Sequence, residues 1–360
     1  MYSFSNTVND ITNMMFFVSM IPFVLFVILT VFRISKRFNK SGTFVHVTPE
    51  NITLEFDMLY NSLYKNNFTE LEKMRKKVRW QKIISNLSFV AFVVSYFLLE
   101  LHQSIKFDNV LVSFAPIIAV VSAILFFVFL IIWFKSNREY AIVYKKEIVK
   151  NFINLLNDKL IYKSDVSAKP FEVQYKIANF DNKVHNRFYV DDYIKGLLDE
   201  QTFIQMADLL VQYHHSGKNS YTETIFNGLF AQTRSNKDIG TTIKISADKF
   251  FKNNSRVQMD SQEFEKYFDI YCDDKILAMQ LLTSDTMECL VDFYNKHYIQ
   301  YEIVLRNDTI YMRFFTGAMF EPKTFGSSMD KEVLFKYYSI LKFVLEVTTK
   351  INKTLQDLDI

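Results

Sequence analysis

The sequence predicts an α-helical membrane region with three transmembrane helices, followed by an α+β domain with a mainly antiparallel sheet and a long C-terminal helix. Three uncharged apolar runs, Met14–Phe32, Ile83–Leu99 and Val110–Phe134, all lie within the first 134 residues. Runs of roughly 17–25 apolar residues match the hydrocarbon thickness of a bilayer. In the second half, strand patterns follow one another instead of alternating with helices, which favours an α+β fold. The segment from about Met329 has the apolar period of an amphipathic helix.

The first apolar run is expected to be a retained span and not a cleaved signal peptide. Met1–Asn13 contains no Lys or Arg and carries Asp10, and the positive charges follow the run. A signal peptide has the opposite arrangement. The predicted organisation is a membrane region over 1–134 with spans at about 14–34, 83–101 and 110–134 and a cytoplasmic helical loop over 35–82, then a stalk helix over 135–162 and a cytoplasmic α+β domain over 163–360.

The distribution of basic residues predicts the orientation in the inner, cytoplasmic membrane. Ten Lys and Arg residues lie between positions 35 and 82, whereas His102–Asn109 contains only Lys106. Five more follow the third run, between Lys135 and Lys150. By the positive-inside rule, the N-terminus faces outward and the C-terminal domain faces the cytoplasm. No ionisable residue lies in the middle of a span, which disfavours a channel or transporter.

Composition excludes several functional classes. The net charge is +3, so there is no global argument for nucleic-acid binding. The two cysteines, Cys272 and Cys289, are expected to be reduced, packed thiols in the cytosolic half. The sequence has no Walker loop, GxGxxG, CxxC or GxSxG motif. We therefore expect no cofactor and no metal site, and the chain gives no positive sign of an enzyme.

Residues 48–82 are expected to be helical. Thr48-Pro49-Glu50 provides one helix start, and Thr69-x-x-Glu72 is a capping box that opens a helix running into the second span. The basic residues here either contact anionic lipid headgroups or only set topology on a solvated helix face. Nucleic-acid binding is disfavoured because no base-reading module accompanies the charge. The candidate lipid contacts are Lys73, Arg75, Lys76, Lys77, Arg79 and Lys82.

The second half is predicted to contain the following elements. A helix covers Tyr140–Leu160, an irregular segment covers Lys163–Asn186, and a short helix covers Tyr189–Leu198. Gly228, inside a strand pattern, indicates a bulge or a close backbone approach, and Ser327 or Ser328 is expected to cap the final helix. Strands are expected within Gln201–His214, Tyr221–Thr233, Thr241–Ser246, Phe268–Cys272, Ile299–Leu305 and Thr309–Phe315, with helices at Lys275–Leu282 and Asp285–His297.

Three polar pairs are candidates for chemistry, and each also has a structural interpretation. Neighbours in a strand point to opposite faces, so His214-His215 is expected to be a strand-end pair and only with a partner such as Glu223 or Cys272 a metal ligand. Asp273-Asp274 is expected to cap a helix, with a carboxylate pair for metal or acid chemistry as the alternative. Asp191-Asp192 has the same two interpretations. Cys289 is expected to pack in the core, since a nucleophile would need an activating base.

Several segments resemble, in order, the bacterial family known as domain of unknown function 3137. Tyr144–Tyr162 resembles its basic entry helix, and Phe226-x-Gly228-Leu229-Phe230 followed by Lys237 and Gly240 resembles its central strand pair. Glu265–Thr283 resembles its strand, acidic turn and helix, and Phe320-Glu321-Pro322 resembles the motif before its final helix. The resemblance covers residues 140–356 and implies a membrane-anchored, uncharacterised protein. It supplies no catalytic residues. The additional earlier span departs from the two spans typical of the family.

These observations favour a membrane-anchored, non-enzymatic interaction or scaffold protein, with an unidentified protein partner and the lipid bilayer as its surroundings. A membrane-bound effector or enzyme of an unrecognised class is the alternative, and it would use Asp273 and Asp274 or His214 and His215. A channel or transporter subunit is less favoured. Self-association is compatible with a small bundle of three spans, and no nucleic acid is expected as a partner.

Overall fold

The computed structural model describes residues 53–105, 110–198, 202–235, 237–247 and 255–358. The described chain forms two compact units. The helical unit contains Thr69–Val143 and Pro322–Ser328. The sheet unit contains Tyr144–Glu321, the C-terminal segment from Met329, and the start of the first described helix as far as Phe68.

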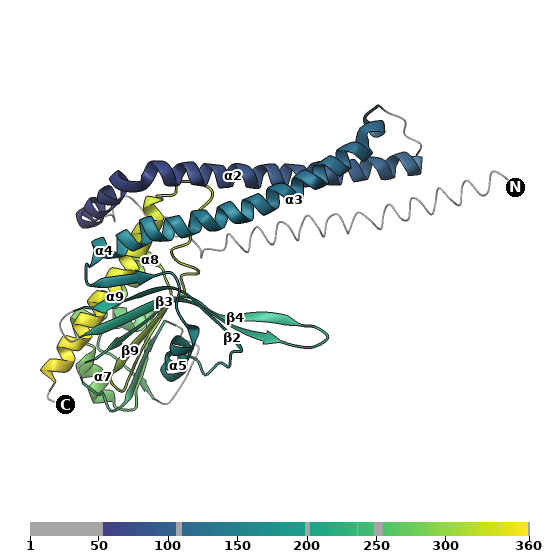
Figure 1. The fold of residues 1–360 in the computed structure, drawn as a ribbon. Helices are drawn as coiled ribbons and strands as arrows, with labels where there is room; N and C mark the ends of the chain where they lie inside the picture. The colour runs from purple at the N-terminus through teal and green to yellow at the C-terminus, as the bar shows by residue number, and fades with distance from the viewer. Residues whose placement is uncertain (1–52, 106–109, 199–201, 236, 248–254, 359–360) are drawn as a thin grey trace. The chain divides into compact units, whose positions relative to one another are not determined.

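The helical unit is built on two long helices, α2 (Leu54–Ile105) and α3 (Val110–Tyr144). They run side by side in Figure 1, and Phe89 packs on Phe126 with ring centroids 5.3 Å apart. Helix α2 is continuous from Leu54, so the predicted second start at Thr69 is wrong. Thr53 lies before its first turn and accepts a hydrogen bond from the Phe56 backbone N–H. The predicted start at Thr48 and the first predicted span, 14–34, lie outside the described residues.

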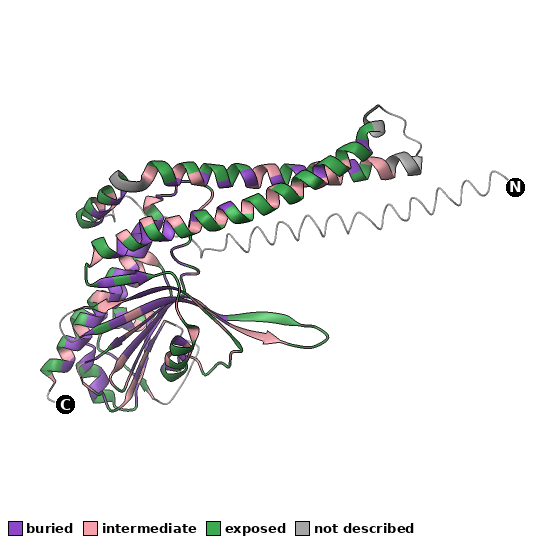
Figure 2. Cartoon of the chain, viewed as in Figure 1, coloured by how far each residue is buried: buried purple, intermediate pink, exposed green. Residues whose placement is uncertain are grey.

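Both helices are long and apolar enough to cross a membrane by length and composition. Many of their apolar residues are exposed instead of buried in a protein core, and Figure 2 colours much of α2 and α3 as exposed. This outward apolar surface, from residue 87 on α2 and residue 114 on α3, coincides with the second and third predicted spans. Exposed members include Leu87, Val90, Val94, Ile117, Val120, Ile124, Phe127 and Ile131.

Helix α3 continues directly into a π-helical turn, η2 (Lys145–Val149), and then α4 (Lys150–Leu156). The predicted helix over Tyr140–Leu160 is therefore present but ends four residues early. Asn157 adopts an extended conformation, and the chain enters β1 (Leu160–Lys163). A π-turn widens the helix locally and changes which side chains face the same neighbour, a feature found often at functional sites.

The sheet unit contains a nine-stranded antiparallel sheet in the order β1-β2-β3-β4-β9-β8-β5-β7-β6. The fold is thus the predicted mainly antiparallel α+β domain with a long C-terminal helix, α9 (Lys331–Asp357). The remaining elements are β2 (Arg187–Leu197), β3 (Phe203–His215), β4 (Tyr221–Arg234), β5 (Thr242–Ser246), β6 (Arg256–Val257), α6 (Gln262–Tyr267), β7 (Asp269–Tyr271), α7 (Lys275–Leu281), α8 (Ser284–His297), β8 (Tyr301–Arg306) and β9 (Thr309–Phe314).

Helices cover both faces of the sheet because side chains alternate along each strand. On β9, Tyr311 packs on one face and donates a hydrogen bond to Gln174 of α5 (Ala168–Ala178). Phe314 points to the other face and contacts Phe343 of α9. Phe343 also stacks on Phe293 of α8, with ring centroids 3.9 Å apart. Two apolar layers therefore hold the sheet, one under α5 and one under α8 and α9 (Figure 1).

Two secondary-structure predictions in this unit are wrong. The segment predicted as a short helix, Tyr189–Leu198, lies in strand β2. The segment predicted as irregular, Lys163–Asn186, contains α5, whose buried residues Phe171, Tyr175 and Ala178 have helical spacing. The final helix is also capped differently: the side chain of Asp330, and not Ser327 or Ser328, accepts the first backbone N–H groups.

Candidate functional site

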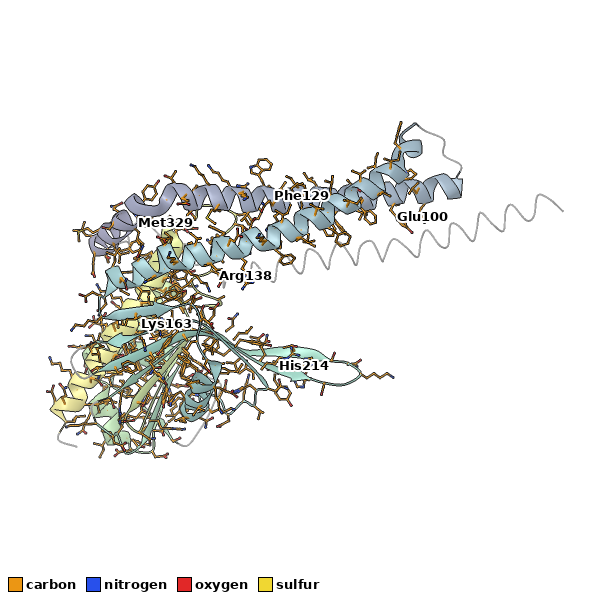
Figure 3. All side chains as sticks on the ribbon, in the orientation of Figure 1. Glu100, Phe129, Arg138, Lys163, His214 and Met329 are labelled. Carbon is orange, nitrogen blue, oxygen red and sulfur yellow. The ribbon has the colours of Figure 1, made fainter. Side chains whose placement is uncertain are left out.

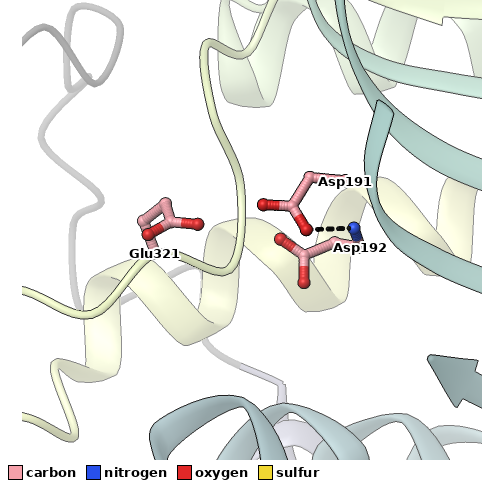
Figure 4. A group of neighbouring side chains, drawn as sticks. All are labelled: Asp191, Asp192 and Glu321. Carbon is pink, nitrogen blue, oxygen red and sulfur yellow. Dashed lines mark hydrogen bonds between the residues drawn. The ribbon is translucent and has the colours of Figure 1, made fainter. Parts of the chain in front are cut away.

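The main polar site is a lysine surrounded by carboxylates, which we call the lysine–carboxylate cluster (Lys145, Asp191, Asp192 and Glu321). The Lys145 Nζ lies 2.9 Å from Asp191 Oδ2, 2.8 Å from Asp192 Oδ2 and 2.8 Å from Glu321 Oε1. Figure 4 shows the three carboxylates converging from β2 and from the segment after β9. Only 10% of the Lys145 side chain is exposed. One buried ammonium group therefore forms ion pairs with three carboxylates.

A bulge in β2 places the two aspartates. The β2–β3 register shifts between Asp191 and Ile194, and Asp192 has a left-handed backbone with φ of 51°. Aspartate tolerates this conformation better than most residues, and a bulge redirects side chains out of the strict alternation of a strand. The Asp192 backbone N–H donates to Asp191 Oδ1 at 2.9 Å. Both carboxylates thereby reach the same ammonium group although they are sequence neighbours.

Within the cluster, burial favours the protonated form of the Asp192 carboxylate. Burial raises the pKa of Asp192 to about 7, against the opposing effect of Lys145. Burial acts to lower the pKa of Lys145, but the attraction of Asp192 and Glu321 outweighs it, so that pKa is raised. Tyr162 of β1 donates its hydroxyl to Asp192 Oδ1. Burial, together with the Asp192 charge, raises the pKa of Tyr162, which remains a neutral donor.

Asp208 adds a further acid on the neighbouring strand. It is paired with Asp191 in the β2–β3 register. Its Oδ2 accepts the backbone N–H of Met319, while its buried Oδ1 has no hydrogen-bond partner among the described residues. Burial, followed by the nearby Asp192 charge, raises the pKa of Asp208 well above its usual range. Burial therefore favours the neutral form of the Asp208 carboxyl group over its charged form.

The three carboxylates are close enough to bind a metal ion, because one oxygen from each lies within 4.8 Å of the others. Oxygen ligands of this kind suit hard divalent cations. Here, however, the Lys145 ammonium is within hydrogen-bonding distance of all three. A metal ion at that position would have to displace the ammonium. The geometry therefore fits an internal ion-pair network better than a metal centre.

The interpretation of Asp191-Asp192 as a helix start is wrong, because both lie in β2. Sequence reasoning also missed Lys145, which lies 46 residues before Asp191. No local pattern pairs residues at that separation. The only available signal was the presence of two adjacent acids in a segment that also contains Tyr189, Val190 and Tyr193, residues with a high tendency to form strands.

The histidine pair lies near the end of β3, in the part of the β3–β4 hairpin where His214 is labelled in Figure 3. His214 Nδ1 lies 3.0 Å from Thr222 Oγ1. The ring of His215 instead stacks on Tyr221, with centroids 4.1 Å apart, and its Nε2 is 3.8 Å from Glu223 Oε2. The two histidines thus have separate partners, as expected for neighbours in a strand.

Asp273-Asp274 has the predicted structural role. The Asp274 side chain caps α7 by accepting the Leu277 backbone N–H at 3.0 Å. Cys272, which precedes the pair, is buried and donates its thiol to the Asp274 carbonyl. Burial raises the pKa of the half-buried Cys289 thiol to about 12, so it lacks the thiolate character of a nucleophile.

The basic residues of α2 divide into two groups. Arg75 is buried: its Nε lies 2.9 Å from Glu72 Oε2, and its Nη1 donates to the Thr324 carbonyl at 3.1 Å. Its inclusion among the candidate lipid contacts is therefore corrected, because its guanidinium binds within the protein. The exposed members are Lys73, Lys76, Lys77 and Arg79, and Lys82 is half-buried. For these five, lipid contact stays a prediction.

Residues 224–353 match the family described as protein of unknown function (DUF3137). This match confirms, over that segment, the family resemblance predicted from the sequence. It includes Glu321 and Gly228, while Lys145, Asp191 and Asp192 precede it. No curated protein matches the chain. The crystal structure of the mycobacterial trehalose monomycolate transport factor A, TtfA, is similar over 55% of this chain and 88% of its own, at 6% identity and a TM-score of 0.31.

Proposed function

We propose that this chain is a multi-pass membrane protein whose α+β domain binds another protein without catalysing a reaction. The observation that carries the membrane part is the outward apolar surface of α2 and α3. Continuous exposed apolar surface of this extent is typical of membrane or partner contact. The two helices also have the length and composition needed to cross a bilayer.

The proposed topology has three spans, at about 14–34, 83–101 and 110–134. The N-terminus lies outside and the α+β domain lies in the cytoplasm. Its basis is the positive-inside distribution, in which Lys106 is the single Lys or Arg of His102–Asn109. Cysteine accessibility in intact cells tests it: Ser220→Cys, in a C289S background, should react with a membrane-impermeant maleimide only after lysis. Labelling before lysis would show that the α+β domain lies outside, the opposite of the proposed orientation.

The lysine–carboxylate cluster supports a scaffold role for the sheet unit. Its ammonium group comes from η2, which continues the helix of α3 along the chain, and its acids come from β2 and the segment after β9. Buried ion pairs can fix one arrangement among alternatives. We infer that the cluster fixes the π-turn on the sheet, so that the domain presents a rigid surface.

The surface proposed for the protein partner is the β3–β4 arm, the hairpin of residues 213–224. Pairing of β3 with β2 ends at Gln212, and pairing of β4 with β9 begins at Leu229. Between these limits the arm is a two-stranded ribbon that projects from the sheet (Figure 1). Isolated two-stranded hairpins are marginally stable in water, and unpaired strand edges readily accept another strand. An arm of this kind is suited to binding a partner along β4.

Site-specific photocrosslinking of the full chain in its native membrane tests this proposal. A photoreactive residue is placed at Lys218, Tyr221 or Glu223 on the arm, with control positions Val184 and Ile276, both more than 70% exposed. We expect one discrete crosslinked product from the arm positions and none from the controls. Equal products at all positions would overturn the assignment of the arm as the partner surface. Release of the protein from membranes by alkaline carbonate would overturn the proposal that it spans the membrane. Turnover of nucleotides or phosphoesters by the purified chain would overturn its non-enzymatic part.

The proximity of the Asp191, Asp192 and Glu321 carboxylates favours a second candidate function, a membrane-bound effector or enzyme of an unrecognised class. It would use these acids in place of the pairs Asp273-Asp274 and His214-His215 named from the sequence. It requires Lys145 to leave its position. Under this alternative, Asp192→Asn abolishes the biological activity of the chain while the arm still crosslinks. Under the interaction proposal, activity and crosslinking are lost together.

A further inference from the structure

We infer that Arg79, Lys82 and Phe325 form a binding site for the phosphate group of an anionic lipid headgroup, which we call the headgroup site. The inference rests on the proposed membrane function and identifies a lipid partner for the helical unit. It also replaces a general basic helix face with two specific cations. The third component, Phe325, lies far from them in sequence.

Both cations lie against the same aromatic ring. The Arg79 Cζ is 5.2 Å from the centroid of Phe325, and the Lys82 Nζ is 5.8 Å from the same centroid. The two residues are three positions apart on α2, so they occupy one face of the helix. Lys82 Nζ also lies 5.4 Å from the ring centroid of Trp133 on α3. Aromatic faces attract cations through the ring quadrupole, which holds the two basic side chains near Phe325.

Phe325 is held in place by hydrogen bonds from both helices to the Pro322–Ser328 segment. Arg75 Nη1 donates to the Thr324 carbonyl, and the Tyr140 hydroxyl donates to the Lys323 carbonyl, both at 3.1 Å. Beyond Phe325, the Ser328 hydroxyl donates to Glu72 at 3.2 Å. The segment is therefore fixed on both sides of the ring, and the ring itself remains 46% exposed.

Among the described residues, no carboxylate neutralises the charge of Arg79 and Lys82. Glu72 is the acid of α2 closest in sequence to Arg79 and Lys82. Its carboxylate accepts hydrogen bonds from Arg75 and Ser328. Neither Arg79 nor Lys82 forms an ion pair with any carboxylate in the part of the chain that the structure describes. Cation–π contacts hold a cation without neutralising it. Two neighbouring positive groups without a counter-charge are the arrangement that binds an anion such as phosphate.

The position along the helices favours a lipid over a soluble anion. Lys82 directly precedes the apolar run Ile83–Leu99, and Trp133 lies at the end of the run Val110–Phe134. The two residues therefore lie at the same level, where the apolar surface ends. Tryptophan and basic residues concentrate at the membrane–water boundary, and an exposed tryptophan, Trp80, precedes Lys82 by two positions in the sequence. At this level the anion available in quantity is a headgroup phosphate.

The test compares two variants with the same loss of charge. Native mass spectrometry of the detergent-solubilised full chain measures binding of phosphatidylglycerol, with phosphatidylcholine as the uncharged reference. Arg79→Gln with Lys82→Gln removes the site, and Lys76→Gln with Lys77→Gln removes two exposed charges on the same helix. Diffuse attraction costs each pair about the same, roughly fivefold per charge. We expect the Arg79 and Lys82 variant to lose at least tenfold more affinity than its control. Equal losses would overturn the site.

An uncharged variant and a soluble anion provide independent readings. Phe325→Leu leaves the net charge unchanged, so diffuse attraction predicts no effect, whereas loss of the cation–π contacts predicts about a threefold to tenfold weaker binding. No change with Phe325→Leu would overturn the inference. Inorganic phosphate should compete only weakly; competition as strong as that of the lipid would assign the site to a soluble anion and overturn the lipid assignment. Failure of membrane anchoring would appear separately, in carbonate extraction.

Discussion

The ammonium group of Lys145 lies 2.8 Å from the carboxylate of Asp192, and the Asp192 residue is fully buried. This contact connects the π-turn after α3 with the bulge of β2, two irregular features that each cost conformational energy. Each irregularity supplies one half of a buried ion pair. The pair therefore stabilises both irregularities, and the removal of Lys145 should destabilise the sheet unit.

Lys145→Met is expected to destabilise the protein strongly. Removing one partner of a buried ion pair leaves its acids uncompensated, which typically costs about 3–5 kcal/mol. The apparent melting temperature of the full chain in detergent measures the effect. Lys146→Met is the matched control, because Lys146 is exposed and its nearest acid, Glu147, is 3.8 Å away. A control that falls as far as Lys145→Met would show that the cluster contributes nothing specific.

Divalent cations are expected to stabilise a variant without the ammonium group but not the native chain. In the native protein Lys145 is hydrogen-bonded to all three carboxylates, so Ca²⁺ or Mn²⁺ should leave the melting temperature unchanged. In Lys145→Ala the same oxygens, within 4.8 Å of one another, become available as ligands. Thermal melting with each ion and with a chelator measures this. Cation-dependent stabilisation of the native chain would instead indicate a resident metal.

The sequence predicts this fold well where the determining contacts are local. Helix α7 follows from Asp274, whose capping oxygen lies three residues from the N–H it accepts. The β8–β9 hairpin follows from two alternating runs separated by Asn307 and Asp308, and Asn307 has a left-handed backbone with φ of 53°. In these elements the residues that signal a structure are the residues that stabilise it.

The lysine–carboxylate cluster could not be predicted in the same way. Asp191-Asp192 resembles a helix start in isolation, and the strand conformation depends on pairing with β3 and on the ammonium of Lys145. Helix α5 was missed for another reason. Phe171, Tyr175 and Ala178 have helical spacing, but the polar residues between them make the segment look like a loop. The headgroup site depends on Phe325, which the chain brings to α2 from the segment before α9.

Asp208→Asn is expected to remove part of the pH dependence of stability. The folded-state pKa of Asp208 is raised well above 3.8, mainly by burial. The folded state thus binds a proton that the unfolded state releases above about pH 4, and stability from this group falls as pH rises through the folded-state pKa. Asparagine preserves the shape and cannot ionise. The advantage of the variant over the native chain should therefore grow as the pH rises above about 4, until the folded-state pKa of Asp208 is passed.

The pH comparison uses the difference between the two proteins because other acids act in the opposite direction. Glu72, for example, has a lowered pKa through its hydrogen bonds with Arg75, and so stabilises the folded state as pH rises. This contribution is common to both chains and cancels. Melting temperatures of the two full chains that stay parallel across the range would contradict a raised pKa of Asp208.

Gly228→Ala is expected to prevent stable folding of the sheet unit. A Cβ at this position would lie 2.0 Å from the Phe314 carbonyl oxygen and 2.7 Å from the Thr316 backbone nitrogen. Both are backbone atoms of the neighbouring segment and cannot rotate away, and the φ of 153° is itself unfavourable for alanine. The close backbone approach predicted from the sequence is thereby confirmed. Relief requires β4 and β9 to separate, a change that should cost about 3 kcal/mol or more.

Gly217→Ala separates the clash from the backbone strain. Gly217 has a similar φ of 148°, but no atom lies within 4 Å of the Cβ that alanine would add. The Gly217→Ala variant should therefore lose only the stability that corresponds to the backbone strain, about 1 kcal/mol. The yield of folded full chain and its melting temperature in detergent measure both variants. A Gly228→Ala protein as stable as Gly217→Ala would mean that β4 and β9 can move apart at little cost, and the close approach at Gly228 would then have no role in fixing the sheet.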